Sequence, residues 1–241
     1  MKKGILKSLK IILYLIILIN FILIGYLRES IANPPKIELV NISRVIDGDS
    51  LALDDGRKVR LLGINTPEKG MILYDKATKF LKELEGKEVK IESIGEDKDR
   101  YGRLLRYVFY QDKLFNEEIL KHGLGNFYSY SKDKYTPRLL EAEEYAREQQ
   151  LGIWKSSPNL GCIELVELKF EENTRCKNQE KIFLNNKCKK IQVLLKDDAT
   201  NIYKIELDNG IFTKNFSCVW NNEGDSVYIW DSEGMVLFYR Y

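Results

Sequence analysis

The pattern of hydrophobic positions begins with an apolar run near the N-terminus. Positions 11–27 are apolar except for Asn20 and follow four lysines with no acid among them. This arrangement is typical of a signal peptide or signal anchor whose lysines stay in the cytoplasm. The run exceeds the usual apolar core of a signal peptide and approaches the length of a membrane span. We expect an anchor, with cleavage after Ala32 as the alternative, and in both cases the rest of the chain lies outside the cytoplasm.

The next part of the chain, residues 37–156, mixes strand and helix patterns. Alternation of apolar and polar residues predicts strands over 37–45, 50–53, 58–64, 89–93 and 104–110. Helical spacing predicts helices over 72–84, 114–121 and 136–152. We expect Thr136 to cap the last helix, because Pro137 then occupies the first helical position. Five short strands with helices between and after them predict a small closed barrel covered by helices.

Helical spacing disappears from residue 162 onward. Short runs of β-branched and aromatic residues alternate there with turn signals such as Asp208-Asn209-Gly210. This spacing is typical of a β-sandwich. A break in the pattern at 156–159 marks a domain boundary. The fold class is therefore mainly β, with an N-terminal hydrophobic helix in residues 1–32, a barrel domain over 37–156 and a sandwich domain over 162–241.

Cysteine usage is confined to the last third of the chain. The four cysteines are Cys162, Cys176, Cys188 and Cys218, and no two of them form a CxxC motif. A zinc ribbon is therefore not expected. In an exported segment of this size, four cysteines predict two disulfides in one of three pairings, with four buried thiols as the alternative.

Composition limits the kinds of site that the chain can form. The chain has one histidine, His122, so sites built on several histidines are excluded. Residues 1–32 carry five basic groups and one acid, which leaves 33 basic and 35 acidic groups for the rest of the chain. The exported part is thus not a polycation, and any phosphate binding must come from a local site.

Three polar clusters contain the residue types that phosphodiester hydrolysis needs. They are VIDGDS at 45–50, RLLGINTPE at 60–68 and DRYGRLLRYV at 99–108. Carboxylate and carbonyl oxygens suit Ca²⁺ or Mg²⁺, and guanidinium groups match a phosphoryl group whose charge grows in the transition state. Each cluster alone is explained equally well by turn chemistry or a solvated strand end. Their combination in this order favours the functional interpretation.

Residues 37–156 resemble the staphylococcal (thermonuclease) nuclease family. The resemblance runs through the three clusters, the segment FNEEILKHGLG at 115–125 and the closing LGIW at 151–154. It implies an OB-fold barrel of five strands with three helices. It also implies calcium-dependent hydrolysis of DNA and RNA that leaves 3′-phosphoryl ends, with Mg²⁺ or Mn²⁺ as alternative metals.

The resemblance also implies roles for individual residues. Catalytic roles fall on Arg60, Glu68 and Arg103, metal binding on Asp49, Asn65 and the Thr66 carbonyl, and a place beside the metal's water shell on Asp47. Asn65 departs from the family pattern, in which a second carboxylate stands at this position. Its amide oxygen can still bind Ca²⁺, but the site loses one negative charge.

Aromatic and basic residues near these clusters are candidates for nucleic-acid binding by stacking or by contact with phosphates. They are Arg100, Tyr101, Tyr128, Tyr130 and Tyr135. Packing explains most of the tyrosines equally well, and we expect His122 to be structural. The rival hypothesis is a non-catalytic nucleic-acid-binding barrel at the cell surface. The presence of Asp49, Arg60, Glu68 and Arg103 together favours an enzyme, which we expect to be monomeric.

The C-terminal part resembles the lamin-tail domain, an immunoglobulin-like sandwich. The resemblance is carried by the segments at 183–210 and 219–241, including WNNEGD, and it departs from the family at Val193, where tryptophan is common. It implies a binding or tethering module whose ligand the sequence does not identify. Asp197, Asp198 and Asp225 are candidates for a cation, although acids in turns are usually structural.

Overall fold

The computed structural model describes residues 12–21, 35–128, 132–169, 180–221 and 224–241. Residues 12–21 form a helix. Within the described residues, no helix is long and apolar enough to cross a membrane. Position 11 and positions 22–27 of the expected anchor lie outside the described part of the chain, so the anchor stays a prediction.

Five strands form the predicted barrel. They are β1 (Ile37–Val45), β2 (Ser50–Leu53), β3 (Lys58–Leu61), β5 (Glu88–Glu92) and β6 (Leu104–Tyr110). The order is β3-β2-β1-β5-β6, and a parallel pairing of β3 with β6 closes the barrel. Closure leaves neither end strand of this order without a partner, which protects a small sheet from pairing with other chains.

The predicted strand 58–64 is divided in two. Its end forms β4 (Ile64–Asn65), which leaves the barrel to pair with β8 (Asn126–Phe127). The break occurs at Gly63, whose φ of 75° disfavours any residue with a side chain. A Cβ at Gly63 would also lie 2.3 Å from Leu139 Cδ1. The turn thus lets a helix approach closely and directs Asn65 away from the barrel wall.

Helices cover one side of the barrel. They are α2 (Tyr74–Leu81), α3 (Phe115–Lys121) and α4 (Thr136–Glu148), with 3₁₀ turns at Lys82–Leu84 and Gly152–Trp154 and the short strand β7 (Lys113–Leu114) before α3. The predicted N-cap at Thr136 is wrong, because Thr136 is already helical. The Asp133 carboxylate accepts the N–H groups of Tyr135 and Thr136 instead. A carboxylate at a helix start satisfies free N–H groups and favours the helix dipole.

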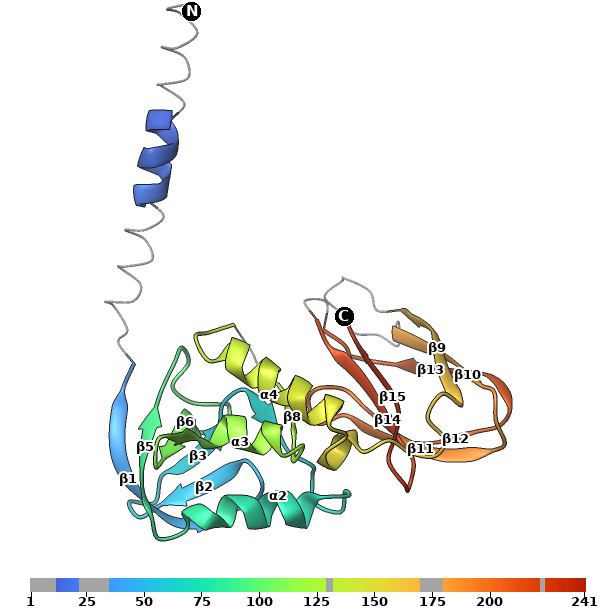
Figure 1. Ribbon diagram of the computed structural model, residues 1–241, viewed down its shortest axis with the longest axis horizontal. Helices are drawn as coiled ribbons and strands as arrows, with labels where there is room; N and C mark the ends of the chain where they lie inside the picture. Colours follow the sequence, from blue (N-terminus) through green and yellow to red (C-terminus); the bar gives the residue numbers. More distant parts are fainter. Residues whose placement is uncertain (1–11, 22–34, 129–131, 170–179, 222–223) are drawn as a thin grey trace, which may run out of the picture.

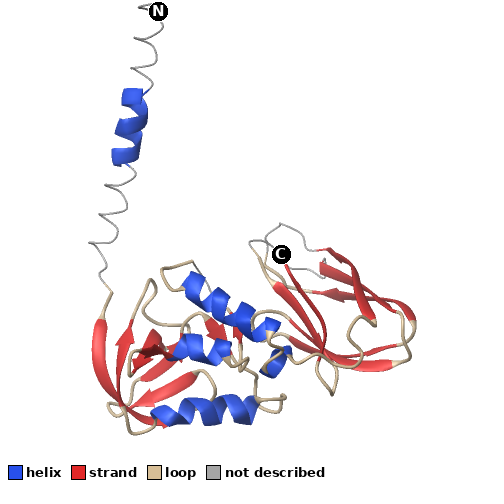
Figure 2. Cartoon of the chain, viewed as in Figure 1, coloured by secondary structure: helices blue, strands red, loops and turns tan. Residues whose placement is uncertain are grey.

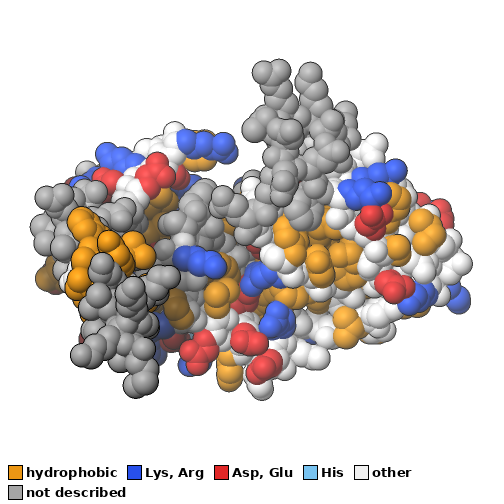
Figure 3. All heavy atoms as spheres, turned by 90° about the horizontal axis from the view of Figure 1, so that it is seen from above, with side chains coloured by type: hydrophobic (Ala, Val, Ile, Leu, Met, Phe, Trp, Pro, Cys, Tyr) orange, Lys and Arg blue, Asp and Glu red, His pale blue; other side chains and the backbone are white. Residues whose placement is uncertain are grey.

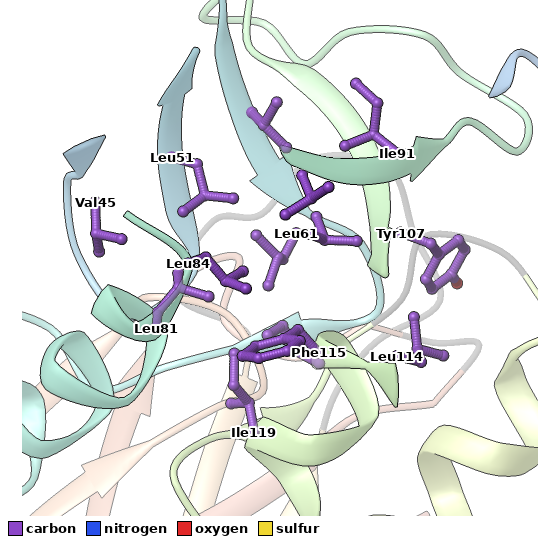
Figure 4. Packing of buried hydrophobic residues seen from close by; sticks show 14 of the residues in the cluster. Val45, Leu51, Leu61, Leu81, Leu84, Ile91, Tyr107, Leu114, Phe115 and Ile119 are labelled. Carbon is purple, nitrogen blue, oxygen red and sulfur yellow. The ribbon is translucent and has the colours of Figure 1, made fainter. Parts of the chain in front are cut away.

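The barrel interior is a single apolar core. Figure 4 shows Leu51 and Leu61 from the strands facing Leu81 of α2 and Phe115 and Ile119 of α3. All five side chains are buried. Burial of apolar side chains from both strands and helices fixes the helices to the barrel.

Two antiparallel sheets follow the barrel. One has the order β13-β10-β9 and the other β12-β11-β14-β15. Their bounds are β9 (Ile163–Lys169), β10 (Glu180–Asn186), β11 (Ile191–Lys196), β12 (Ile202–Leu207), β13 (Gly210–Phe216), β14 (Ser226–Trp230) and β15 (Met235–Arg240). Buried residues of both sheets share one apolar cluster. We call residues 163–240 the C-terminal sheets.

Disulfides cross-link the C-terminal sheets. Cys162 and Cys188 form a disulfide, and Cys218 is also disulfide-bonded. The prediction of disulfides rather than free thiols is confirmed for these three residues. Cys176, the fourth cysteine, lies outside the described residues.

Helix α4 and the turn that follows it connect the barrel to the C-terminal sheets (Figures 1 and 2). Trp154 of the turn packs with Tyr228 and Trp230 of β14 in a shared apolar cluster. The Trp230 Nε1–H group donates to the Ile153 carbonyl over 2.8 Å. Arg240 of β15 forms an ion pair with Glu143 of α4. The two parts therefore contact each other through packed side chains and a largely buried ion pair, not only through the linking chain.

The Glu143–Arg240 pair provides a test of this contact. The Glu143 carboxylate is 3% exposed and also accepts the Phe127 N–H group. Replacing Glu143 by alanine removes the closest acid from the Arg240 guanidinium and the acceptor from this N–H group, so we expect a loss of about 3 kcal/mol in the free energy of unfolding. The loss is not larger, because Asp198, Ser226 and Tyr228 still contact the guanidinium. The measurement is urea unfolding of the variant and the wild type.

The neighbouring Glu144 is the matched control for this experiment. Its pair with Arg147 is exposed, so Glu144→Ala should change the free energy of unfolding by less than about 0.5 kcal/mol. Equal effects of the two substitutions would show that the buried pair does not stabilise the contact.

Candidate active site

The site begins at the turn between β1 and β2. Gly48 separates Asp47 from Asp49 in this turn. A Cβ on Gly48 would lie 2.6 Å from Thr66 Oγ1 and 2.8 Å from Ala77 Cβ. Only glycine lets the turn pack this closely against Thr66 and helix α2. The close approach brings the Asp49 carboxylate to the end of β4.

The Asp49 carboxylate is buried and holds three segments together. Its Oδ2 atom accepts the Thr66 N–H group at 3.0 Å and the Thr66 hydroxyl at 2.9 Å. The same oxygen lies 3.3 Å from the Arg60 guanidinium. Oδ1 accepts the Ser50 hydroxyl at 3.1 Å. Bonds from a backbone amide, two hydroxyl groups and an arginine satisfy a carboxylate that burial would otherwise destabilise.

Asp47 adds a second carboxylate beside Asp49. Its Oδ1 atom accepts the Asp49 N–H group at 3.1 Å. Burial, and then the charge of Asp49, raise the pKa of Asp47. Two like charges in a partly buried turn repel each other, and a bound cation would relieve this repulsion.

Both arginines of the site are held by carboxylates. Arg60 donates to the Asn65 side-chain oxygen at 3.0 Å, in addition to its contact with Asp49. Arg103 donates to Asp99 at 2.7 Å and to the Ser50 hydroxyl at 3.2 Å. Side chains held in this way lose little conformational freedom when a phosphate approaches.

Arg60 and Arg103 both line a small hollow of about 20 Å³. It is lined by residues 60–64 together with Asp99, Arg103, Leu105 and Tyr128. Glu68 follows β4 and is exposed. In the described part of the chain its carboxylate forms no hydrogen bond or close ion pair, so it is available to a substrate or water. The structure thus brings Asp47, Asp49, Arg60, Asn65, Thr66 and Arg103 together, with Glu68 at the edge.

The remaining candidates differ in their surroundings. Tyr101 is 69% exposed and stacks with Arg100, whose Cζ lies 4.8 Å from the ring centroid. Tyr135 packs on Tyr107 and donates to Glu92, which supports a packing role. Tyr130 lies outside the described residues. His122 packs on Phe80, and its Nδ1 atom lies 2.8 Å from the Glu118 carbonyl, as expected for a structural residue.

The oxygen atoms at this site fit a hard cation. The set comprises the Asp47 and Asp49 carboxylates and the Asn65 side-chain oxygen, with the Thr66 carbonyl as the candidate from the backbone. Ca²⁺ and Mg²⁺ prefer such oxygen ligands, and two mutually repelling carboxylates favour a cation. No group of three or more acidic, histidine or cysteine side chains suited to a metal occurs among the described residues. Neutral oxygens would therefore supply part of any metal coordination.

Sequence reasoning missed several residues that hold this site. Ser50 donates to Asp49 and accepts from Arg103, and Asp99 fixes Arg103. Both stand inside the motifs VIDGDS and DRYGRLLRYV, so a search for partners of the charged residues would have found them. Asn126 and the turn 196–199 of the C-terminal sheets also reach the site. Asp197 and Asp225 accept amide N–H groups, and Asp198 accepts the Tyr228 hydroxyl, as expected for structural residues.

Comparison with known proteins agrees with this geometry. The family model described as "Staphylococcal nuclease homologue" matches residues 58–156. The thermonuclease of Staphylococcus intermedius is 38% identical over 125 residues, which cover 47% of this chain and 74% of that protein. The chain belongs to the staphylococcal nuclease family. A thermonuclease of Staphylococcus hyicus is 36% identical over 48% of this chain and 75% of its own length, and the endonuclease YncB of Bacillus subtilis is 35% identical over 52% and 65%.

The family model matches the chain from β3 onward and does not reach the C-terminal sheets. The matched region begins at residue 58 and ends at residue 156, before β9 begins. Figure 3 shows acidic and basic side chains interspersed over the described residues on this face, without a large area of one sign. A member of the staphylococcal nuclease family with such a surface depends on the local arginines to bind a phosphate.

Replacement of Asp47 by asparagine tests the repulsion at the site. The introduced amide keeps an oxygen for the Asp49 N–H group but removes one of two repelling charges. We expect a higher melting temperature without metal at pH 7 and a smaller rise in melting temperature when Ca²⁺ is added. Differential scanning fluorimetry with and without chelator measures both.

Asp54→Asn is the control, because Asp54 is exposed in the β2–β3 hairpin. It should change neither quantity. An unchanged response of the Asp47 variant to Ca²⁺ would remove Asp47 from the surroundings of the metal.

Proposed function

We propose that this protein is a calcium-dependent nuclease that hydrolyses phosphodiester bonds of DNA and RNA. The observation that carries the proposal is that Arg60 and Arg103 line one hollow, with Arg60 also paired with the buried Asp49 carboxylate. Its relatives named as thermonucleases and as an endonuclease support hydrolysis of nucleic acid. The activity on both DNA and RNA follows from the family resemblance alone.

The arginines act on the phosphate. Arg60 and Arg103 bind the non-bridging oxygens of the scissile phosphodiester and stabilise the charge that grows there in the transition state. Glu68 orients a water molecule and accepts its proton during attack on phosphorus. Tyr128, which lines the same hollow, is placed to contact the sugar or base beside that phosphate.

The metal site of the proposal comprises Asp49, Asn65 and the Thr66 carbonyl, with Asp47 contacting the water shell. A bound Ca²⁺ neutralises charge on the phosphate. Asp49 is the ligand that burial and four donor groups hold in place. Mg²⁺ and Mn²⁺ also accept these oxygen ligands, so the metal preference needs measurement.

Substitution of the catalytic residues tests the enzymatic role. Arg60→Ala and Glu68→Ala should each remove about 3–4 kcal/mol of transition-state stabilisation, seen as a loss of roughly 100- to 1,000-fold in kcat/KM. Cleavage of single- and double-stranded substrates in Ca²⁺, Mg²⁺, Mn²⁺ or chelator provides the measurement.

Arg57→Ala and Glu83→Ala are matched controls for charge. Arg57 pairs with Glu38 and Asp55 at the far end of the hairpin, and Glu83 is exposed. Both variants should cut like the wild type. Binding of nucleic acid without cleavage in any metal would instead support the rival function, a non-catalytic binding barrel.

We also propose that residues 11–27 anchor the chain in a membrane, with the barrel outside the cytoplasm. The apolar run after four lysines supports this orientation. The alternative is secretion after cleavage behind Ala32. In this proposal the chain has three parts. Residues 1–32 are the anchor, residues 37–156 are the nuclease domain, and residues 162–241 are a lamin-tail-like accessory domain that binds or tethers. The protein acts as a monomer in this proposal, and the ligand of the accessory domain is not assigned.

Cell fractionation tests the anchor. The full chain should remain in the membrane fraction after alkaline carbonate washing, because a run of this length is buried in lipid. The double variant Leu15→Lys, Ile19→Lys should lose this retention. A soluble wild-type protein whose N-terminus is Asn33 would establish cleavage instead.

A further inference from the structure

The turn between β11 and β12 reaches from the C-terminal sheets into the nuclease site. The Asn65 side-chain amide donates to the carbonyl of Ala199 at 2.6 Å and to that of Asp198 at 3.2 Å. These residues are more than 130 positions apart in the chain. A residue that the family resemblance places among the metal ligands is thus bound directly by the C-terminal sheets.

The contacts fix the orientation of the Asn65 amide. Carbonyl acceptors surround its nitrogen, while its oxygen accepts from the Arg60 guanidinium at 3.0 Å. The chemistry of the partners on each side therefore determines which atom is nitrogen. An aspartate at this position would place a carboxylate oxygen against two carbonyl oxygens. Asparagine at position 65 is accordingly matched to the turn.

Asn126 makes a second connection to the same turn. It lies opposite Asn65 in the β4–β8 pair, and its side-chain amide also donates to the Asp198 carbonyl, at 3.1 Å. One carbonyl of the C-terminal sheets therefore accepts from both strands of this small sheet. This shared acceptor holds β4, and with it the residues that follow it, in one position relative to the turn.

Lys196 brings a buried positive charge to the same place. Its ammonium group donates to the Asp197 carbonyl at 2.9 Å, and the residue is 2% exposed. Lys196, Asn126 and Pro67, the residue before Glu68, line one cavity of about 290 Å³. Burial lowers the pKa of Lys196 to about 8, while the charges of Asp197, Asp198 and Glu68 oppose the shift. The ammonium group also donates at 3.3 Å to the Asp198 carbonyl, which is the carbonyl that accepts from Asn65 and Asn126.

Other residues of the C-terminal sheets hold the turn in place. The Tyr228 hydroxyl donates to the Asp198 carboxylate at 2.7 Å, and the Asp198 N–H group donates to Asp225 at 3.0 Å. Tyr228 in turn packs against Trp154 at the end of the barrel domain. The packed contact between the two parts thus determines where the turn meets Asn65.

The turn does not cover the hollow that both arginines line. All residues that line this hollow belong to positions 60–128. The turn therefore supports Asn65 and does not occupy the hollow in which we place the phosphate.

We propose that the turn 196–199 is a positioning element of the nuclease site, in which Lys196 fixes the Asp198 carbonyl and the carbonyls of Asp198 and Ala199 orient the Asn65 amide. This inference rests on the proposed nuclease activity. In it, the C-terminal sheets contribute to the hydrolytic step itself. Lys196 is a positioning residue, because it acts through Asn65.

The test uses the full chain with Lys196→Met, which removes the charge and keeps the length of the side chain. We expect kcat to fall about 10- to 100-fold with little change in KM, because misplacement of Asn65 beside Arg60 impairs the chemical step. Lys204→Met on the exposed side of β12 is the control and should leave kcat unchanged.

A double-mutant cycle separates positioning from general disruption. In the Asn65→Ala background, Lys196→Met should have no further effect on the residual rate, because the side chain that it positions is absent. An equal loss in both backgrounds, or no loss in the wild type, would overturn the inference. A faster Lys196→Met enzyme would also overturn it, by showing that the turn inhibits the site.

A second variant covers the case in which Lys196→Met does not fold. Asn65→Asp should lower kcat about 10-fold despite its added carboxylate, since the carbonyls of the turn repel it. A rise in kcat would contradict the role of these carbonyls. If the wild type cuts no substrate, the proposed function fails, whereas an active wild type with unaffected variants refutes only the role of the turn.

Discussion

The site depends on one buried carboxylate. Asp49 connects the turn after β1, the arginine on β3 and the backbone after β4 through the oxygen that accepts from Thr66 and contacts Arg60. The segment that carries Thr66 is too short to hold its own position, since β4 contains two residues. Hydrogen bonds to a carboxylate are strong where water is excluded, and the loss of one donor there costs stability. The barrel therefore serves to bring the donors to Asp49, and Gly48 is the residue that permits their approach.

Much of this arrangement could be predicted from the sequence. Strands β1, β2 and β6 have the predicted bounds, because alternation and turn residues act locally. The three motifs contain the residues that meet at the hollow. Errors occur where a distant contact decides the local structure. The strand predicted over 58–64 breaks at Gly63 because Leu139 of α4 packs there, and Asp133 displaces Thr136 as the acceptor at the start of α4.

The contact between Asn65 and the turn 196–199 could not be predicted in this way. Asn65 is a departure from a family pattern, and the sequence suggests only the loss of a charge. Its partners are backbone carbonyls, which any residue type provides, so no motif marks them. Lys196 ends an ordinary strand pattern, and its burial depends on how the C-terminal sheets pack on α4. The partners of Asn65 and the burial of Lys196 therefore depend on a contact between two parts of the chain that are distant in sequence.

The same contacts explain how a nearly neutral protein can bind a polyanion at one place. Both arginines of the hollow are paired with carboxylates, Arg60 with Asp49 and Arg103 with Asp99. A phosphate must therefore share partners that are already fixed, and the attraction extends over a short distance only. Binding energy then comes from the fit of the guanidinium groups to the phosphate rather than from bulk charge. A site of this kind requires rigid supports, and the barrel and the C-terminal sheets each supply one side.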